Sequence, residues 1–271
     1  MRAGGEDVVG SATGGRRTLL APAKLTVSLR VTGVRLDGYH ELDAEMVALD
    51  LADELRFDPE GAGLVVEAAA GVRAQELPVP GHNLVAAALA ACGRRAAVRL
   101  TKRIPLGGGL GGGSADAAAV LRWAGVTDLV LAARLGSDVP FCLVGGRARV
   151  QGIGEVVTPL AFERRDYLLV LPPFGVDTAR VYRAWDADPV DAGPNALTAA
   201  ALAVEPRLAV WRDALGNLSG IEPTLAGSGS TWFVPGGPPD ARTASSTSLR
   251  VDGETARLVR VRTVPAGWEG D

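Results

Sequence analysis

The stretch Ile104-Pro-Leu-Gly-Gly-Gly-Leu-Gly-Gly-Gly-Ser114 is the most distinctive in the sequence, because glycine fills every position from 107 to 113 except Leu110. Glycine adopts positive φ angles without steric cost and lets a ligand approach the backbone closely. Strongly helix-forming, alanine-rich sequence follows. A helix that starts behind such a loop offers unpaired N–H groups and a partial positive charge. The stretch therefore predicts a phosphate site, with Ser114 either capping the helix or turning its hydroxyl to a phosphate or a metal.

Two common phosphate-binding loops do not match this pattern. No Gly-Lys-Ser/Thr stands at the helix start, so the loop is not of the Walker type. A dinucleotide-binding turn would need an acidic residue about 20 positions further on, where Asp128 is only a weak candidate. A flexible linker or tight helix–strand packing is the structural alternative. The strand-like sequence before the loop and the alanine-rich helix after it favour the phosphate site.

The whole chain has 271 residues, a length typical of one large or two smaller domains. Its net charge of −3 provides no global basic field, so we expect no nucleic-acid partner. No apolar run approaches the ~18 residues of a membrane span, and the polar, Gly-rich residues 1–17 are expected to be a disordered tail rather than a secretory signal. Cys92 and Cys142 lack metal-binding spacing, so buried free thiols and a cytoplasmic location are predicted.

Lysine is rare in this sequence. Only two of the 28 basic residues, Lys24 and Lys102, are lysine, and the others are arginine. A compact ammonium differs chemically from a planar guanidinium, which suggests that both positions require an ammonium. Lys24 starts an alternating segment that predicts a strand with Leu25, Val27 and Leu29 on one face and Lys24 on the other. A solvated surface lysine is the equally weighted alternative.

Hydrophobic periodicity and the Gly and Pro positions predict a mixed α+β chain without internal repeats. Helices are expected at 84–91, 114–125, 128–135, 178–185, 195–203 and 206–215, and strands at 18–31, 41–49, 51–57, 64–67, 97–102, 167–172 and 255–264. A strand and turn are expected at 147–155, a linker at 159–165, a second glycine turn that runs into a strand at 225–234, and an irregular segment at 235–248.

Several polar and aromatic residues have both structural and functional interpretations. Tyr39 and His40 either pack on a hairpin and face solvent, which we favour from the residues alone, or form a stacking and hydrogen-bonding surface for a flat ligand. Asn83 fits the N-cap of the helix at 84–91. Asp138, between a glycine turn and an apolar Val-Pro-Phe, either caps a helix or serves as a base beside the phosphate site.

Three segments together resemble the motifs of the GHMP small-molecule kinases: residues 21–27, 104–118 and 225–230. Residues 37–40 and 135–141 are similar to the branch of that superfamily that uses ATP to phosphorylate the 2-hydroxyl of a cytidine-diphosphate sugar alcohol in non-mevalonate isoprenoid biosynthesis. The resemblance extends from about residue 18 to about residue 234, with the motifs in the same order and spacing.

The resemblance implies a two-domain α+β fold with the site in the cleft. A ribosomal-S5-like nucleotide-binding domain would span 18–158, and a ferredoxin-like GHMP C-terminal domain would span 159–271. It also implies a small-molecule substrate, ATP and Mg²⁺, and leaves the oligomeric state open. Other GHMP activities, on homoserine or mevalonate, and a catalytically silent nucleotide-binding module are the alternatives.

The resemblance also implies roles for individual residues. Lys24 and Asp138 would be the catalytic pair, and Ser114 would be the candidate protein ligand of magnesium. The substrate would contact Tyr39, His40, Thr178 and Tyr182, with the two tyrosines stacking on the cytosine. ATP would contact Asn83, Lys102, Pro105, Gly107, Gly108, Gly109, Gly111, Gly112, Gly113, Ser114 and Ala115. Two departures stand out: Thr26 replaces the usual asparagine, and the segment from Asn83 to Lys102 is short.

Overall fold

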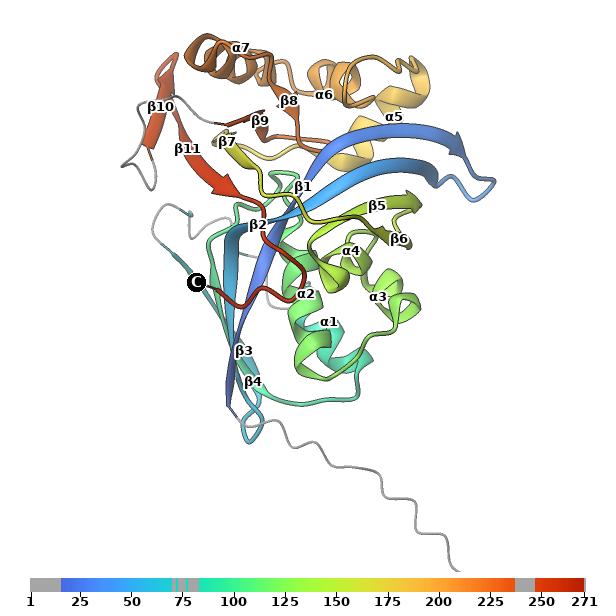
Figure 1. Ribbon diagram of the computed structural model, residues 1–271, viewed down its shortest axis with the longest axis vertical. Coiled ribbons are helices and arrows are strands. Elements are labelled where there is room, and N and C mark those ends of the chain that lie inside the picture. Colours follow the sequence, from blue (N-terminus) through green and yellow to red (C-terminus); the bar gives the residue numbers. More distant parts are fainter. Residues whose placement is uncertain (1–15, 70–71, 73–76, 78–82, 237–246, 271) are drawn as a thin grey trace, which may run out of the picture.

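The structure, a computed structural model, describes residues 16–69, 72, 77, 83–236 and 247–270, which form two β-sheets with helices packed on them (Figure 1). The N-terminal part contains β1 (Arg17–Val34), β2 (His40–Asp58), β3 (Gly63–Ala68), α1 (Leu84–Ala91), β4 (Ala97–Lys102), α2 (Gly112–Trp123), α3 (Leu129–Leu135), α4 (Val139–Val144), β5 (Arg147–Gly152) and β6 (Val156–Pro159). The C-terminal part contains β7 (Asp166–Leu171), α5 (Thr178–Ala187), α6 (Thr198–Val204), α7 (Leu208–Ser219), β8 (Thr224–Leu225), β9 (Trp232–Pro235), β10 (Thr247–Val251) and β11 (Glu254–Arg262). The α+β class predicted from the sequence is confirmed.

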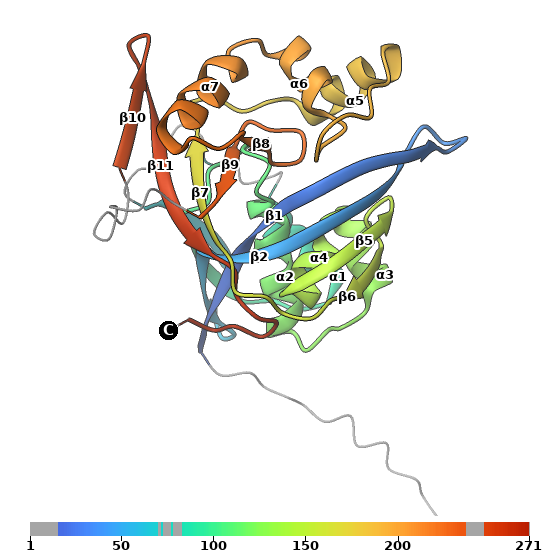
Figure 2. The ribbon, with the colours of Figure 1, turned by 45° about the horizontal axis from the view of Figure 1, so that its top comes forward.

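The first sheet is built around the long β1–β2 hairpin, whose far end projects toward α5 (Figure 2). β2 pairs with β1 along one edge and with β4 and then β5 along the other. The prediction of two strands at 41–49 and 51–57 was wrong, because β2 runs unbroken through Asp50. The Asp50 carboxylate accepts a 2.9 Å hydrogen bond from the backbone N–H of Arg262, so this polar residue is satisfied within an extended strand. Helices α1 to α4 cover one face of this sheet (Figure 1).

Strand β1 does not keep the single apolar face that its alternation predicted. Its register shifts between Thr26 and Ser28, which is the effect of a β-bulge. Leu25 packs in a core that joins the two sheets, whereas Leu29 packs in the main core. Lys24 and Thr26 are buried rather than solvated, because the glycine loop and the second glycine turn pack against them. The bulge therefore moves the apolar residues of β1 from one core to the other, and the polar face before it is covered by the two glycine segments.

The second sheet is antiparallel, with the order β10-β11-β7-β9-β8. The apolar strand predicted at 167–172 is its central strand, β7, as expected. Strands β6 and β10 were not predicted, and most of the segment expected to be irregular at 235–248 lies outside the described residues. β1 begins at Arg17, inside the range predicted as a tail, and residues 1–15 also lie outside the described residues.

Both cysteines are free thiols, as predicted, although Cys92 is only half-buried. Burial raises the pKa of the Cys142 thiol to about 12, which leaves it inert at neutral pH. No helix among the described residues combines the length and apolar character needed to cross a membrane.

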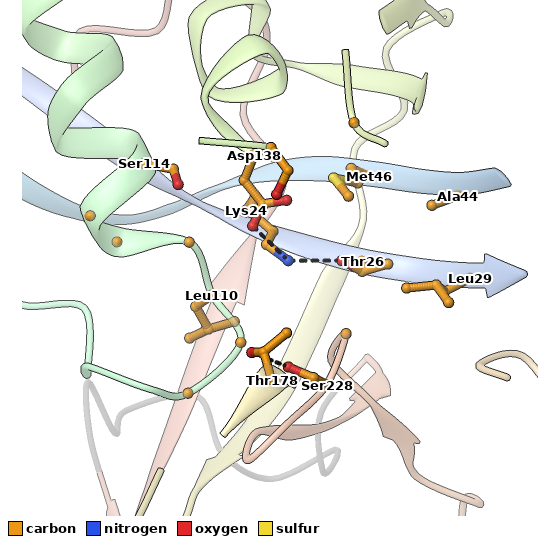
Figure 3. Close-up of a pocket in the computed structure, with 18 of the residues that line it drawn as sticks. Lys24, Thr26, Leu29, Ala44, Met46, Leu110, Ser114, Asp138, Thr178 and Ser228 are labelled. Carbon is orange, nitrogen blue, oxygen red and sulfur yellow. Dashed lines mark hydrogen bonds and ion pairs between the residues drawn. The ribbon is translucent and has the colours of Figure 1, made fainter. Parts of the chain in front are cut away.

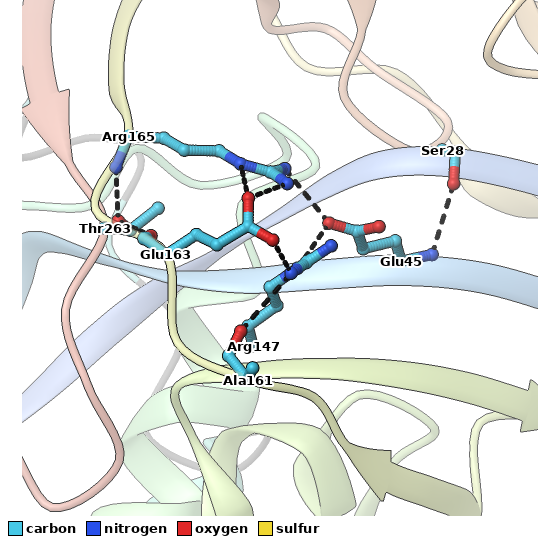
Figure 4. A network of polar contacts seen from close by, with 7 residues as sticks. All are labelled: Ser28, Glu45, Arg147, Ala161, Glu163, Arg165 and Thr263. Atoms are coloured by element: carbon cyan, nitrogen blue, oxygen red, sulfur yellow. Dashed lines mark hydrogen bonds and ion pairs between the residues drawn. The ribbon is translucent and has the colours of Figure 1, made fainter.

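The segment between the sheets has no regular structure at 160–165 and is fastened to both of them (Figure 4). Glu45 on β2 accepts hydrogen bonds from the guanidinium groups of Arg147 (2.8 Å) and Arg165 (3.0 Å). The Glu163 carboxylate binds the same two arginines. Thr263, just after β11, donates to the carbonyl of Glu163 at 2.7 Å. This network fixes the connection against β2, β5 and the second sheet.

A second polar cluster is buried between β2, β4 and α2. The Lys102 ammonium binds carboxylate oxygens of Asp53 on β2 and of Asp116 on α2, the latter at 2.7 Å. Asp53 also accepts a 2.9 Å hydrogen bond from the backbone N–H of Ile104. Burial raises the pKa of Asp116 to about 8, since the attraction of Lys102 only partly offsets the loss of solvation.

The raised pKa of Asp116 predicts how stability depends on pH. In the unfolded chain an aspartate titrates near pH ~4, so between ~4 and about 8 the folded protein holds a proton that the unfolded chain has released. The contribution of Asp116 to the free energy of unfolding is therefore fully present below pH ~4 and is lost as the pH rises to about 8. The Asp116→Asn variant, which cannot titrate, should lack this loss.

Urea denaturation at pH 5, 6.5 and 8 measures the effect. The variant should gain stability relative to the wild type as pH rises across this range. Asp213→Asn is a matched control, because Asp213 is exposed and should leave the pH dependence of stability unchanged. Parallel pH curves for Asp116→Asn and the wild type would contradict the prediction.

Candidate functional site

A cavity of about 330 Å³ lies where the glycine loop, the β1–β2 pair and the second glycine turn meet (Figure 3). The side chains of Lys24, Thr26, Ser114, Asp138 and Thr178 line it. They come from four separate stretches of the chain: β1, the start of α2, the residue before α4, and the start of α5. The cavity therefore joins the predicted phosphate loop to the predicted catalytic pair.

The loop requires glycine at two positions for reasons of space as well as backbone angle. Gly109 has φ +77°, and a Cβ there would lie 2.3 Å from the carbonyl oxygen of Ala226. Gly111 has φ +65°, and a Cβ there would lie 2.7 Å from Cγ of Lys24. Both contacts are far inside van der Waals distance, so only glycine lets the loop pack against the second glycine turn and Lys24.

The loop is held by its carbonyl groups. The carbonyls of Gly107, Gly108 and Leu110 accept hydrogen bonds from the backbone N–H groups of Val176 (3.4 Å), Thr231 (3.2 Å) and Lys24 (3.0 Å). Within the described part of the chain, the backbone N–H groups from Gly109 to Ser114 donate no hydrogen bond. A run of unpaired amides beside a cavity is a strong anion site, because each amide gains a partner when a phosphate binds.

Helix α2 begins earlier than the sequence predicted. It starts at Gly112 with Gly111 as its N-cap, so the prediction that Ser114 caps the helix was wrong. The left-handed conformation of Gly111 turns the chain into the helix without any side-chain cap. Ser114 lies in the first turn and lines the cavity, which leaves its hydroxyl for a phosphate or a metal ion.

Lys24 and Asp138 lie side by side at the cavity and point toward each other (Figure 3). Lys24 Nζ lies 3.4 Å from Asp138 Oδ2 and donates a 3.1 Å hydrogen bond to Thr26 Oγ1. Asp138 occupies the N-cap position of α4, but its side chain makes no capping hydrogen bond, so the cap interpretation does not account for its carboxylate. Its side chain is 29% exposed, compared with 7% for Lys24. The carboxylate is therefore the member of the pair that a substrate can reach.

Three residues predicted to contact ATP are placed elsewhere. Lys102 is fully buried and does not line the cavity, because Asp53 and Asp116 hold its ammonium below the loop. Ala115 is buried in the core, and its N–H donates to the carbonyl of Gly111 within the helix. Asn83 caps α1 through a 2.9 Å bond from the N–H of Val85, which is the structural interpretation. Its amide nitrogen is buried without a partner among the described residues.

The predicted aromatic residues come together only in part. The rings of His40 and Tyr182 lie 4.5 Å apart, and His40 Nε2 lies 2.7 Å from a carboxylate oxygen of Asp186. Tyr182 lines the cavity, and burial, followed by the nearby charge of Asp138, raises its pKa. Tyr39 is 59% exposed and makes no aromatic contact within the described residues. The predicted pair of stacking tyrosines is therefore not assembled around the cavity in this structure.

The second glycine turn supplies a wall that the sequence predicted only as a motif. Ser228 lines the cavity and its hydroxyl lies 2.8 Å from that of Thr178. Asn195 is buried and donates to the carbonyls of Leu225 (2.8 Å) and Gly227 (2.7 Å), which holds the turn in place. Neither Ser228 nor Asn195 was singled out from the sequence. The available signal in the sequence was an asparagine at the start of a predicted helix.

Comparison with known proteins agrees with this geometry. Residues 82–146 match the model of the GHMP kinases N terminal domain. A 4-diphosphocytidyl-2-C-methyl-D-erythritol kinase of Pelotomaculum thermopropionicum is 38% identical, over 90% of this chain and 93% of its own length. One of Carboxydothermus hydrogenoformans is 35% identical, over 80% and 87%.

A solved structure of the same enzyme, 4-(cytidine 5'-diphospho)-2C-methyl-D-erythritol kinase, also resembles this one. It superposes with a TM-score of 0.67 at 33% identity, covering 90% of this chain and 99% of its own. Both the sequence match and the structural match extend over most of the molecule. The chain belongs to the GHMP kinases and, within them, to the 4-diphosphocytidyl-2-C-methyl-D-erythritol kinase family.

Proposed function

We propose that this protein transfers the terminal phosphoryl group of ATP to the 2-hydroxyl of 4-diphosphocytidyl-2-C-methyl-D-erythritol, a step in non-mevalonate isoprenoid precursor synthesis. One observation carries the proposal: the unpaired amides of the loop and the Lys24–Asp138 pair open onto one cavity. Family membership supports the choice of alcohol, because the similar relatives bear that enzyme's name. A cytoplasmic location stays a prediction from the sequence.

Asp138 is the proposed general base. A sugar-alcohol hydroxyl is a poor nucleophile at neutral pH and gains from losing its proton as the new O–P bond forms. The partly exposed Asp138 carboxylate would accept that proton while the bond from the phosphorus to the ADP oxygen breaks. The Lys24 ammonium, held by Thr26 and Asp138, would stabilise negative charge at the reacting group.

The glycine loop would supply most of the electrostatic stabilisation. Phosphoryl transfer depends mainly on positioning and on neutralising the oxygens of the transferring group. The free N–H groups from Gly109 to Ser114 are preorganised donors for those oxygens. The residues present also suit magnesium, because the Ser114 hydroxyl at the cavity is an oxygen donor and this ion needs few protein ligands beside phosphates and water. Bound there, magnesium would neutralise phosphate charge.

The end of the cavity near α5 is the proposed site for the base of the substrate. Tyr182 provides an aromatic surface there, and His40 against it provides its second ring nitrogen, Nδ1, for hydrogen bonding, since Nε2 is bound to Asp186. Thr178 lies at the start of the same helix and lines the cavity. Tyr39 lies on the adjacent turn and would have to approach Tyr182 when substrate binds.

Asp138→Asn should separate binding from catalysis. The amide keeps the shape of the side chain but cannot take a proton, so kcat should fall by ~10²–10⁴ while the Kd for ATP stays within a few-fold. Asp128→Asn is the control, since Asp128 also precedes a helix, α3, and asparagine caps equally well. Turnover of Asp138→Asn within a few-fold of the wild type would show that Asp138 is not the base.

The choice of alcohol is tested by ADP release with the proposed substrate and with its 2-deoxy analogue. Only the compound with a 2-hydroxyl should support release above the ATP-hydrolysis background. Homoserine and mevalonate, assayed in parallel, should give background rates. Equal rates with the substrate and the 2-deoxy analogue would exclude the proposed reaction.

Thr26 should act by holding Lys24. Thr26→Val has nearly the same shape but lacks the hydroxyl that accepts from Lys24 Nζ, so kcat should fall about tenfold, the effect of one hydrogen bond to a charged group. Thr26→Ser retains the hydroxyl and should restore most of kcat. The two variants should bind ATP equally. A fully active Thr26→Val would mean that the Lys24–Thr26 bond has no role in turnover.

A further inference from the structure

The buried position of Lys102 is not explained by the proposed function. It is one of only two lysines, yet its side chain is fully buried and lies outside the cavity. A buried ion pair is weak support for stability, because desolvation of the charges offsets their attraction. A cluster of three buried ionisable side chains therefore needs an explanation other than stability. Its position under the glycine loop offers one.

One end of the cluster holds the start of the loop. Asp53 Oδ1 accepts hydrogen bonds from the backbone N–H groups of Arg103 (2.5 Å) and Ile104 (2.9 Å), the residues between β4 and the loop. Its other carboxylate oxygen accepts from the Lys102 ammonium. Asp53 is completely buried, so all these bonds are shielded from water. Asp53 therefore fixes the direction in which the chain leaves β4.

The other end of the cluster holds the helix that follows the loop. Lys102 Nζ donates to Asp116 Oδ2 at 2.7 Å, and Asp116 lies in the second turn of α2. The same ammonium would lie only 3.1 Å from a Cβ at Gly112, the first residue of the helix. Lys102 Nζ is thus connected to both ends of the loop: to its start through Asp53 and to the helix after it through Asp116. Lys102 does not line the cavity.

We propose that Asp53, Lys102 and Asp116 form a brace that holds the loop amides in the geometry for binding a nucleotide's phosphates, so that all three are positioning residues for ATP. This proposal rests on the proposed function of the loop. A glycine-rich segment loses much conformational freedom when it orders. Hydrogen bonds at both ends of the loop, together with those of the loop carbonyls, order the loop before ATP binds. The conformational entropy cost of ordering it is then not subtracted from the binding free energy, so ATP binds more tightly.

Asp53→Asn tests the brace. The amide oxygen can still accept from Arg103 and Ile104, but the NH₂ group then faces the Lys102 ammonium, donor against donor. The Kd for ATP should rise about tenfold or more, as expected for losing a hydrogen bond to a charged group. The Kd for adenosine, which has no phosphate, should not change. The KM for ATP should rise more than kcat falls, and the KM for the alcohol should stay constant.

Asp50→Asn is the matched control. Asp50 lies on the same strand and also accepts a backbone N–H, but from Arg262 on β11 rather than from the loop. This variant should bind ATP and adenosine like the wild type. Should Asp53→Asn fail to fold, the double variant Lys102→Gln/Asp116→Asn carries the test, because it removes the ammonium together with its partner carboxyl group and keeps hydrogen-bonding groups at both positions.

The outcomes are distinguishable by titration calorimetry with ATP and adenosine. A selective loss of ATP affinity supports the brace. An equal loss for both ligands means general disruption and overturns it, as does unchanged ATP affinity. Because the titration uses no alcohol, its result stands even if the proposed phosphoryl acceptor is wrong. Failure of the proposed function would instead appear as absent turnover in a wild type that binds ATP normally.

Discussion

The unpaired backbone amides from Gly109 to Ser114 are the constraint on which the rest of the site depends. They are free because the loop carbonyls point the other way, toward Lys24, Val176 and Thr231, and take the hydrogen bonds that anchor the loop. Only glycine permits this, since a Cβ at position 109 would collide with the second glycine turn. The second sheet, which carries that turn, therefore shapes a loop that belongs to the first.

The local features of the site could be predicted from the sequence because they depend on residues close together in the chain. The glycine run followed by helix-forming sequence predicted the loop that lines the cavity, and the apolar run at 167–172 predicted the central strand of the second sheet. The start of α2 was misplaced by two residues, because the left-handed Gly111, and not a side chain, makes the cap. A glycine N-cap gives no distinct signal within a run of glycines.

Features that depend on contacts between residues far apart in the sequence could not be predicted from sequence patterns. Alternation in β1 left a solvated Lys24 as an equal alternative, whereas the glycine loop and the second glycine turn, distant in sequence, pack against Lys24 and Thr26 and bury both residues. Asp53 gave no signal, because its partners lie about 50 positions away. The meeting of Lys24 with Asp138 was expected only through the family resemblance. Lys102 was expected at the nucleotide for the same reason, and the structure places it behind the loop.

A crystal structure with a non-hydrolysable ATP analogue bound tests the central claim most directly. Phosphate oxygens should lie within ~2.7–3.2 Å of backbone nitrogens between Gly109 and Ser114, with the terminal phosphate beside Lys24 and Asp138. Phosphates bound elsewhere, with these amides hydrogen-bonded to water alone, would contradict the account.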